Sequence, residues 1–164
     1  MVILGIDPGI AIVGYGLINY EAGKCSLIGY GTINTPAKTQ LSYRLNSIYM
    51  DMQTILDRFK PDAIAIEELF FNTNAKTAIN VAHARGVLVL AAKQKNIPIY
   101  EYTPLQVKQA VVGYGRAEKK QVMEMTREQL KMAKVARPDD AADALALAIC
   151  HANTLRFPIK QECI

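Results

Sequence analysis

The sequence contains few cysteines and histidines, and their spacing disfavours a zinc site or a disulfide framework. The three cysteines, Cys25, Cys150 and Cys163, are an odd set and lie too far apart for a zinc knuckle or a disulfide framework. Reduced thiols are therefore expected. His83 and His151 lie in apolar stretches with helical spacing, which favours packed or surface histidines over metal ligands.

Long apolar runs are also absent. No segment approaches the roughly 20 apolar residues that cross a bilayer, and no basic start followed by an apolar stretch indicates a signal peptide. The 164 residues are 51% hydrophobic, which suffices for one domain with a buried core. We expect a cytoplasmic protein without membrane contact, with one domain over residues 1–155 and a short tail over 156–164.

Positive charge is in modest excess but is unevenly distributed. The formal net charge is +4, whereas residues 103–137 alone contain eight Lys or Arg and three Glu, a net charge of +5. Such a block is either a solvated helix face or a track for nucleic-acid phosphates. Lys119 and Lys120 fall in the first turn of an expected helix, where cations oppose the helix dipole, so an anionic partner is favoured.

The chain opens with an apolar segment that ends in a carboxylate. Residues 2–6 are apolar and rich in β-branched side chains, which predicts a buried strand that delivers Asp7 to its rim. Pro8 and Gly9 then permit a tight turn. Because strand side chains alternate, Gly5 shares a face with Asp7, and we expect it to leave open space beside the carboxylate for a metal or a large ligand. The alternative is that Asp7 only starts the turn.

The following segments predict a mixed sheet. Residues 12–20 and 25–35 have strand composition and short connections, which favours an antiparallel meander with the first strand. Residues 39–59 have the period of an amphipathic helix. Residues 62–70 predict a strand that lies parallel to its neighbour through a right-handed crossover, and residues 97–102 predict a fifth strand. The expected fold class is α/β, with three antiparallel and two parallel strands flanked by helices.

Residues 73–96 predict a long helix that is apolar beyond one stripe. A helix without a polar back is buried on two sides, so one side can cover the sheet and the other is left for a partner or for another helix. Shorter helices are expected after Thr103, over 117–132 and from Pro138 onward, the last with acids in its first turns.

Four acids lie at the ends of these elements. Asp7 and Glu67 end two strands and meet at one sheet edge if the strands are adjacent, while Asp140 and Asp143 lie at the start of the last helix. Carboxylate oxygens suit Mg²⁺ or Mn²⁺, and carboxylates packed together without a cation repel one another. Two such ions roughly 3.5 to 4 Å apart activate a water and stabilise the departing oxygen of a phosphodiester. The alternative for Glu67 and the adjacent Glu68 is a solvated loop pair.

These segments resemble the RuvC family of bacterial Holliday junction resolvases over residues 3–152. The motifs that carry the similarity are each weak alone but specific in this order and spacing. They are Gly5-Ile6-Asp7-Pro8-Gly9, Ala65-Ile66-Glu67 with Phe70, Ala84-Arg85-Gly86, Val107-Lys108-Gln109, Ala117-Glu118-Lys119 and Asp140-Ala141-Ala142-Asp143-Ala144-Leu145. The resemblance implies a ribonuclease H-like fold, a homodimer, and an endonuclease that resolves four-way DNA junctions by paired, symmetric nicks in recombination and repair.

The resemblance also implies roles for the acids. Asp7, Glu67, Asp140 and Asp143 become catalytic metal ligands, with two Mg²⁺ ions per active site that Mn²⁺ can replace. Asp139 adds an acid beside this set, and spacings of three and four residues both place side chains on one helix face, so geometry alone also allows Asp139 with Asp143. The resemblance selects Asp140 with Asp143. Asp139 is then expected to cap the helix or complement its dipole.

DNA contacts and partners are implied in the same way. Lys108 and Lys119 match motif lysines at the scissile phosphate or backbone, and Phe70 matches an aromatic residue that stacks on an unpaired base near the junction centre. Arg116 and Lys120 are added as candidates for DNA binding within the basic segment. The implied partners are four-way junction DNA and the RuvA and RuvB branch-migration proteins, and the implied location is the nucleoid-associated bacterial cytoplasm.

Three other functions are compatible with part of these features. A ribonuclease H acting on RNA–DNA hybrids would use the same carboxylates, and a non-catalytic module for branched DNA would need only the basic segment. Actin-like kinases and chaperone ATPases share a Gly-Ile-Asp-x-Gly start but need a duplicated domain, for which 164 residues are too few. Acids near DNA disfavour binding alone, because they repel it unless a metal neutralises them. The doubly apolar helix favours the junction, whose approximate two-fold symmetry requires two active sites.

Overall fold

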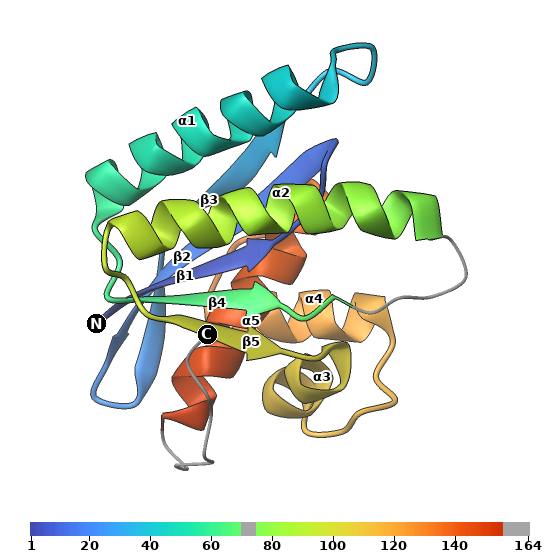
Figure 1. Ribbon diagram of the computed structural model, residues 1–164. Helices are drawn as coiled ribbons and strands as arrows, with labels where there is room; N and C mark the ends of the chain where they lie inside the picture. Colours follow the sequence, from blue (N-terminus) through green and yellow to red (C-terminus); the bar gives the residue numbers. More distant parts are fainter. Residues whose placement is uncertain (70–74, 156–164) are drawn as a thin grey trace.

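The computed structural model describes residues 1–69 and 75–155, and its centre is one five-stranded sheet (Figure 1). The strands are β1 (Val2–Asp7), β2 (Ile12–Glu21), β3 (Lys24–Asn34), β4 (Ala63–Glu67) and β5 (Ile99–Tyr102). Their order is β3-β2-β1-β4-β5. β2 pairs antiparallel with β1 and β3, whereas β4 pairs parallel with β1 and β5. The predicted mixed sheet is confirmed.

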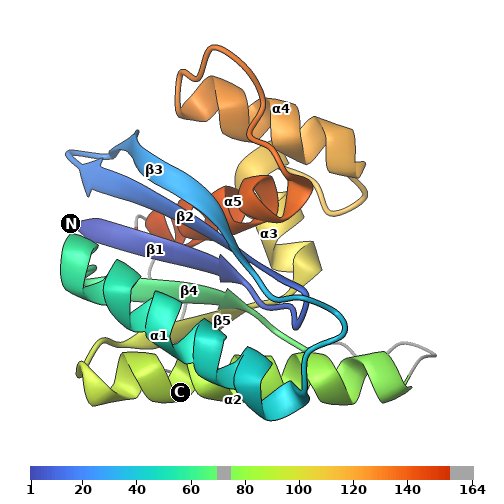
Figure 2. The ribbon, with the colours of Figure 1, turned by 90° about the horizontal axis from the view of Figure 1, so that it is seen from above.

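Helices cover both faces of this sheet. They are α1 (Leu41–Phe59), α2 (Ala75–Gln94), α3 (Pro104–Val112), α4 (Lys119–Gln129) and α5 (Asp139–Thr154). α1 and α2 lie on one face, and α5 lies on the other together with α3 and α4 (Figure 1 and Figure 2). Within the described ranges, no helix is both long and apolar enough to cross a bilayer.

Alternation along β1 divides its side chains between two apolar cores. Leu4 and Ile6 pack with side chains of α1 and α2, whereas Ile3 packs on the side of α5. All three are almost completely buried. Asp7 has the same parity as Ile3 along the strand and therefore points to the face that α5 covers. β1 thus presents its terminal carboxylate toward α5.

The backbone of α5 lies directly against glycines of β1 and β2. A methyl group on Gly5 would collide with the carbonyl oxygen of Ala144, and one on Gly14 would collide with that of Asp140. The expectation that Gly5 leaves open space for a ligand is wrong, because the backbone of α5 fills that space. The glycines instead allow the first turns of α5, which carry Asp140 and Asp143, to approach the end of β1.

The start of α3 is fixed by a reciprocal pair of hydrogen bonds. The hydroxyl of Thr103 accepts a bond from the backbone N–H of Gln106 (3.2 Å), and the Gln106 side chain accepts one from the backbone N–H of Thr103 (2.8 Å). Pro104 occupies the first turn, as its fixed backbone angle favours. The short helix expected after Thr103 is therefore present, and its capped start follows the end of β5 and carries Lys108 in its middle.

α2 buries one side and exposes apolar residues on the other. Ala84, Leu88 and Ala91 are buried in the core between this helix, α1 and the sheet. The side chains of Ile79 and Leu90 are 55% and 54% exposed. The helix and its excess of apolar residues are as predicted, and a partner for the exposed side stays a prediction.

Replacing Gly5 with alanine tests the close packing of α5. The added methyl group has no space, so α5 must move or the backbone must strain, and overpacking of this kind costs about 1–3 kcal/mol. We expect Gly5→Ala to lower the free energy of unfolding in urea by about that amount. Gly29→Ala is the matched control, because a methyl group at this β3 position meets nothing within 4 Å. Equal stability of the two variants would contradict the packing described.

Candidate active site

The ends of β1 and β4 and the start of α5 meet at one edge of the sheet. β1 and β4 are parallel neighbours in register, so the residues that end them, Asp7 and Glu67, lie side by side. The first two turns of α5 bring Asp140 and Asp143 to the same edge. The charges of Glu67, Asp140 and Asp143 all act on the carboxyl group of Asp7. The structure therefore brings the four acids together, and their roles as metal ligands stay a prediction.

Burial and mutual repulsion perturb these acids. The pKa of Asp7 is raised to about 8, first by burial and then by the charges of Glu67, Asp143 and Asp140. Burial is also the main cause of the raised pKa values of Glu67 and Asp143. Asp7 therefore holds a proton at neutral pH and shares a hydrogen bond with Glu67. Clustered carboxylates reach this state when no cation neutralises them.

The ammonium group of Lys119 lies at this cluster. Its Nζ is 2.8 Å from Oδ2 of Asp143 and 3.6 Å from Oδ2 of Asp139. Burial lowers the pKa of Lys119, but the hydrogen bond and charge of Asp143, together with those of Asp139, raise it on balance. Lys119 thus contributes one positive charge to a group of side chains with several ionisable acids.

The donor atoms of the cluster fit a hard divalent cation. Asp7, Glu67, Asp140 and Asp143 offer carboxylate oxygens only, which Mg²⁺ and Mn²⁺ prefer. The raised pKa of Asp7 supports the fit, because a cation at this place would relieve the repulsion that causes part of the shift. Among the residues described, no three acid, histidine or cysteine side chains are already grouped closely enough to hold a metal ion.

Lys108 helps to line a recess beside the acids, which we call the acidic recess. A cavity of about 170 Å³ is lined by Glu67, Lys108, Lys119 and Asp143, together with apolar side chains of α3, α4 and α5. The two lysines of the motifs are therefore placed beside two of the acids. Two positively charged side chains thus lie at a recess that an anionic group could enter.

The other residues expected to bind DNA lie elsewhere. Arg116, in the loop before α4, and Lys120, in the first turn of α4, are exposed, and neither lines the acidic recess. Their roles in DNA binding stay a prediction. Phe70 lies outside the described residues.

Asp139 has a different environment from the one expected. Pro138 occupies the N-cap position of α5, and no side chain caps that end of the helix. Of the two roles expected for Asp139, capping is not seen in the described part of the chain, where Arg137 and Lys119 engage its two oxygens. Asp139 still lies in the first turn, where a negative charge complements the helix dipole.

Glu68 faces away from the cluster. Its charge acts on Arg85 of α2, and Arg85 also forms an ion pair with Glu101 of β5. Glu68 follows Glu67 directly, so alternation sends the two side chains to opposite faces. Sequence reasoning missed the Arg85–Glu101 pair, because its members come from separate elements and no local spacing connects them.

The histidines have the structural roles that the sequence predicts. His151 is 1% exposed, and its Nδ1 lies 2.6 Å from the hydroxyl oxygen of Tyr102. Burial lowers the pKa of His151 to about 4, so the ring is neutral at physiological pH. This contact fastens α5 to the end of β5. His83 is exposed on α2.

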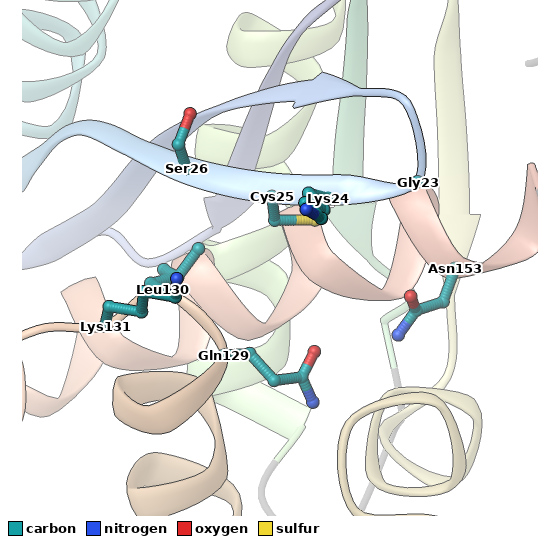
Figure 3. Close-up of a pocket in the computed structure, with 8 residues that line it drawn as sticks. All are labelled: Gly23, Lys24, Cys25, Ser26, Gln129, Leu130, Lys131 and Asn153. Atoms are coloured by element: carbon teal, nitrogen blue, oxygen red, sulfur yellow. The ribbon is translucent and has the colours of Figure 1, made fainter.

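Figure 3 shows a second, larger cavity. Within the described parts of the chain, it shares no lining residue with the acidic recess. Its volume is about 730 Å³, and it lies between the turn that joins β2 to β3 and the C-terminal ends of α4 and α5. The residues that line it are Gly23, Lys24, Cys25, Ser26, Gln129, Leu130, Lys131 and Asn153. Among the residues that the structure describes, the lining of this cavity includes no carboxylate, the ligand type that Mg²⁺ prefers.

Comparisons with known proteins agree on one family. The family model for crossover junction endodeoxyribonuclease RuvC matches residues 3–151. A crossover junction endodeoxyribonuclease RuvC from Alkaliphilus oremlandii is 57% identical over 157 residues, which cover 96% of each chain. The Thermus thermophilus RuvC structure matches with a TM-score of 0.92 and 36% identity over 100% of both chains. The structure of T. thermophilus RuvC in complex with a Holliday junction substrate matches with a TM-score of 0.91 and 34% identity, again over 100% of both chains.

The raised pKa of Asp7 predicts a pH-dependent cost of folding when no metal is present. An unfolded aspartate ionises near pH 4, whereas the folded carboxyl group ionises near pH 8. The folded state therefore binds this proton more tightly, and stability falls as the pH rises between these values. Asp7→Asn removes the titration. We measure the free energy of unfolding in urea with EDTA present. The value for the variant minus that for the wild type should increase as the pH rises from about 5 to about 9.

Metal addition supplies the second half of this test. Mg²⁺ at high pH should stabilise the wild type, because it binds the folded state only, and should have little effect on Asp7→Asn. A difference between the two proteins that does not change with pH would contradict a buried ionisable carboxyl group at this position.

Proposed function

The chain belongs to the RuvC family of crossover junction endodeoxyribonucleases, and from that premise we propose that its acidic cluster is a metal-dependent cleavage centre. The protein is a nuclease of the Holliday junction resolvase family. The observation that carries the proposal is the convergence of four acids from β1, β4 and α5 at one edge of the sheet, where Glu67, Asp140 and Asp143 all perturb the buried carboxyl group of Asp7. Strongly perturbed groups of this kind gather at functional sites, where a ligand compensates their repulsion.

The proposed ligands are Asp7, Glu67, Asp140 and Asp143. They would hold Mg²⁺, with two ions expected and Mn²⁺ able to substitute. The bound ions supply an activated water and stabilise the departing oxygen of the phosphodiester. The chain itself holds the ligands in position: paired strands fix the two that end β1 and β4, and the packing of α5 on the sheet fixes the other two.

Lys108 and Lys119 are proposed to orient the scissile phosphate. Both lysines line the recess that Glu67 and Asp143 also line, so a phosphate beside the acids would lie near positively charged side chains. Arg116 and Lys120, exposed near the start of α4, would bind the backbone farther from the cut. Phe70 keeps its implied role of stacking on an unpaired base.

We infer a homodimer that uses the exposed side of α2. Ile79 and Leu90 give this side an apolar character, and a four-way junction with approximate two-fold symmetry needs two active sites for paired nicks. RuvA and RuvB are proposed partners by family resemblance. The proposed location is the bacterial cytoplasm at the nucleoid, and the proposed nuclease domain spans residues 1–155.

One assay tests the proposed function against its rivals. The protein is incubated with a labelled four-way junction, an RNA–DNA hybrid or a linear duplex, each with Mg²⁺ or with EDTA. We expect paired nicks in the junction with Mg²⁺ only. Faster cleavage of the hybrid would favour a ribonuclease H, and junction binding without any metal-dependent cleavage would favour a binding module.

Substitutions in α5 test which acids are ligands. Asp140→Asn and Asp143→Asn are each expected to abolish Mg²⁺-dependent nicking in a folded protein, because each removes a charged ligand. Asp139→Asn should still cleave at saturating Mg²⁺. Initial rates measure the cleavage, and circular dichroism checks that the variants fold. If Asp139→Asn is inactive while Asp140→Asn cleaves normally, the ligand pair is Asp139 with Asp143.

A charge on α2 tests the homodimer. We expect Leu90→Glu to shift the protein toward monomer in sedimentation velocity and to uncouple the paired nicks, because a carboxylate is costly in an apolar interface. Leu105→Glu is the matched control, since this leucine is 55% exposed on α3 instead. A wild type that is monomeric at micromolar concentration would argue against the paired-nick mechanism, as would unchanged sedimentation of Leu90→Glu.

A further inference from the structure

Lys119 lies between two carboxylates of α5 that have different proposed uses. Its Nζ donates a hydrogen bond to Oδ2 of Asp143 at 2.8 Å, and Oδ2 of Asp139 lies 3.6 Å away. Asp143 is a proposed metal ligand, whereas Asp139 is not. The ammonium group therefore has a second acceptor within reach, and using that acceptor takes no ligand from the cluster.

Asp139 is held in place from its other side. Arg137 contacts Oδ1 of Asp139, while Oδ2 is the atom nearest to Lys119. The side chains of Lys119, Asp139 and Asp143 are 54%, 43% and 35% exposed. These three charged side chains thus lie at the rim of the acidic cluster, where they have room to change hydrogen-bond partners.

A metal ion and the ammonium group of Lys119 compete for Asp143. Both are positive, so a metal ion held by the Asp143 carboxylate would repel the ammonium group that donates a hydrogen bond to its Oδ2. Placing a cation on Asp143 therefore costs the interaction with Lys119. A neighbouring carboxylate that accepts the displaced ammonium group offsets part of that cost.

We propose that Asp139 is a positioning residue that accepts the ammonium group of Lys119 when a divalent cation binds Asp143. The exchange requires little movement, because the two groups are already 3.6 Å apart. It also keeps Lys119 at the rim of the recess, where a DNA phosphate would approach, instead of releasing it to solvent. This inference rests on the proposed function, since it requires a metal ion on the acids.

Calorimetric titration of the DNA-free protein with Mn²⁺ tests the exchange. We expect Asp139→Asn to weaken Mn²⁺ binding by about two- to five-fold, the range for one exposed ion pair. Lys119→Met removes the competing ammonium group and should strengthen binding. Adding Asp139→Asn to Lys119→Met should then change the affinity much less than in the wild type, because no ammonium group remains to be accepted.

The controls separate this exchange from a general effect of charge. Asp57→Asn also removes an acid from an exposed lysine pair, with Lys95 at 2.5 Å, and should leave Mn²⁺ affinity unchanged. If Asp139→Asn weakens binding by the same factor with and without Lys119→Met, Asp139 acts only through its charge and the inference is overturned. Mn²⁺ binding that is undiminished in Asp7→Asn would overturn the proposed metal site as well, because the ion would then lie elsewhere.

Discussion

The acidic cluster depends on the contact between the backbone of α5 and the glycines of β1 and β2. Gly5 and Gly14 have no side chains that would hold the helix away, so the carbonyl groups of Ala144 and Asp140 approach the sheet backbone directly. A side chain at either position would lift the first turns of α5, and the carboxylate of Asp143 with them, from the ends of β1 and β4. The packing of α5 on the sheet and the geometry of the site therefore both require that these two positions have no side chain.

This close approach has an electrostatic consequence. The same packing that buries Asp7 also brings other acids to it, and together these effects raise its pKa to about 8. Lys119 opposes the repulsion through its hydrogen bond to Asp143, but it supplies only one positive charge. A further positive charge among these acids is therefore favourable. Because the available ligands are carboxylate oxygens, a hard divalent cation suits the cluster best. The same recess is lined by Lys108, which extends the positive potential toward an incoming phosphate.

Local patterns in the sequence predict much of this arrangement, and the rest depends on distant contacts. The alternation of side chains and the parallel pairing of β1 with β4 predict that Asp7 and Glu67 meet. The role of Gly5 cannot be predicted in the same way. A glycine in a strand has the same sequence pattern whether a ligand or the backbone of a distant helix occupies the space beside it. The sequence also does not predict that Lys119 contacts Asp143, because this contact depends on how α4 and α5 lie against each other. No local period encodes that arrangement.

Anomalous X-ray diffraction from crystals soaked in Mn²⁺ tests most directly whether the four acids form a metal centre. We expect anomalous peaks bounded by the carboxylates of Asp7, Glu67, Asp140 and Asp143, because the repulsion among these groups is greatest there and their oxygens are the ligands that Mn²⁺ prefers. We also expect Nζ of Lys119 to have left Asp143. Well-diffracting soaked crystals with no anomalous peak at these acids, or with Mn²⁺ bound only elsewhere, would contradict the proposed centre.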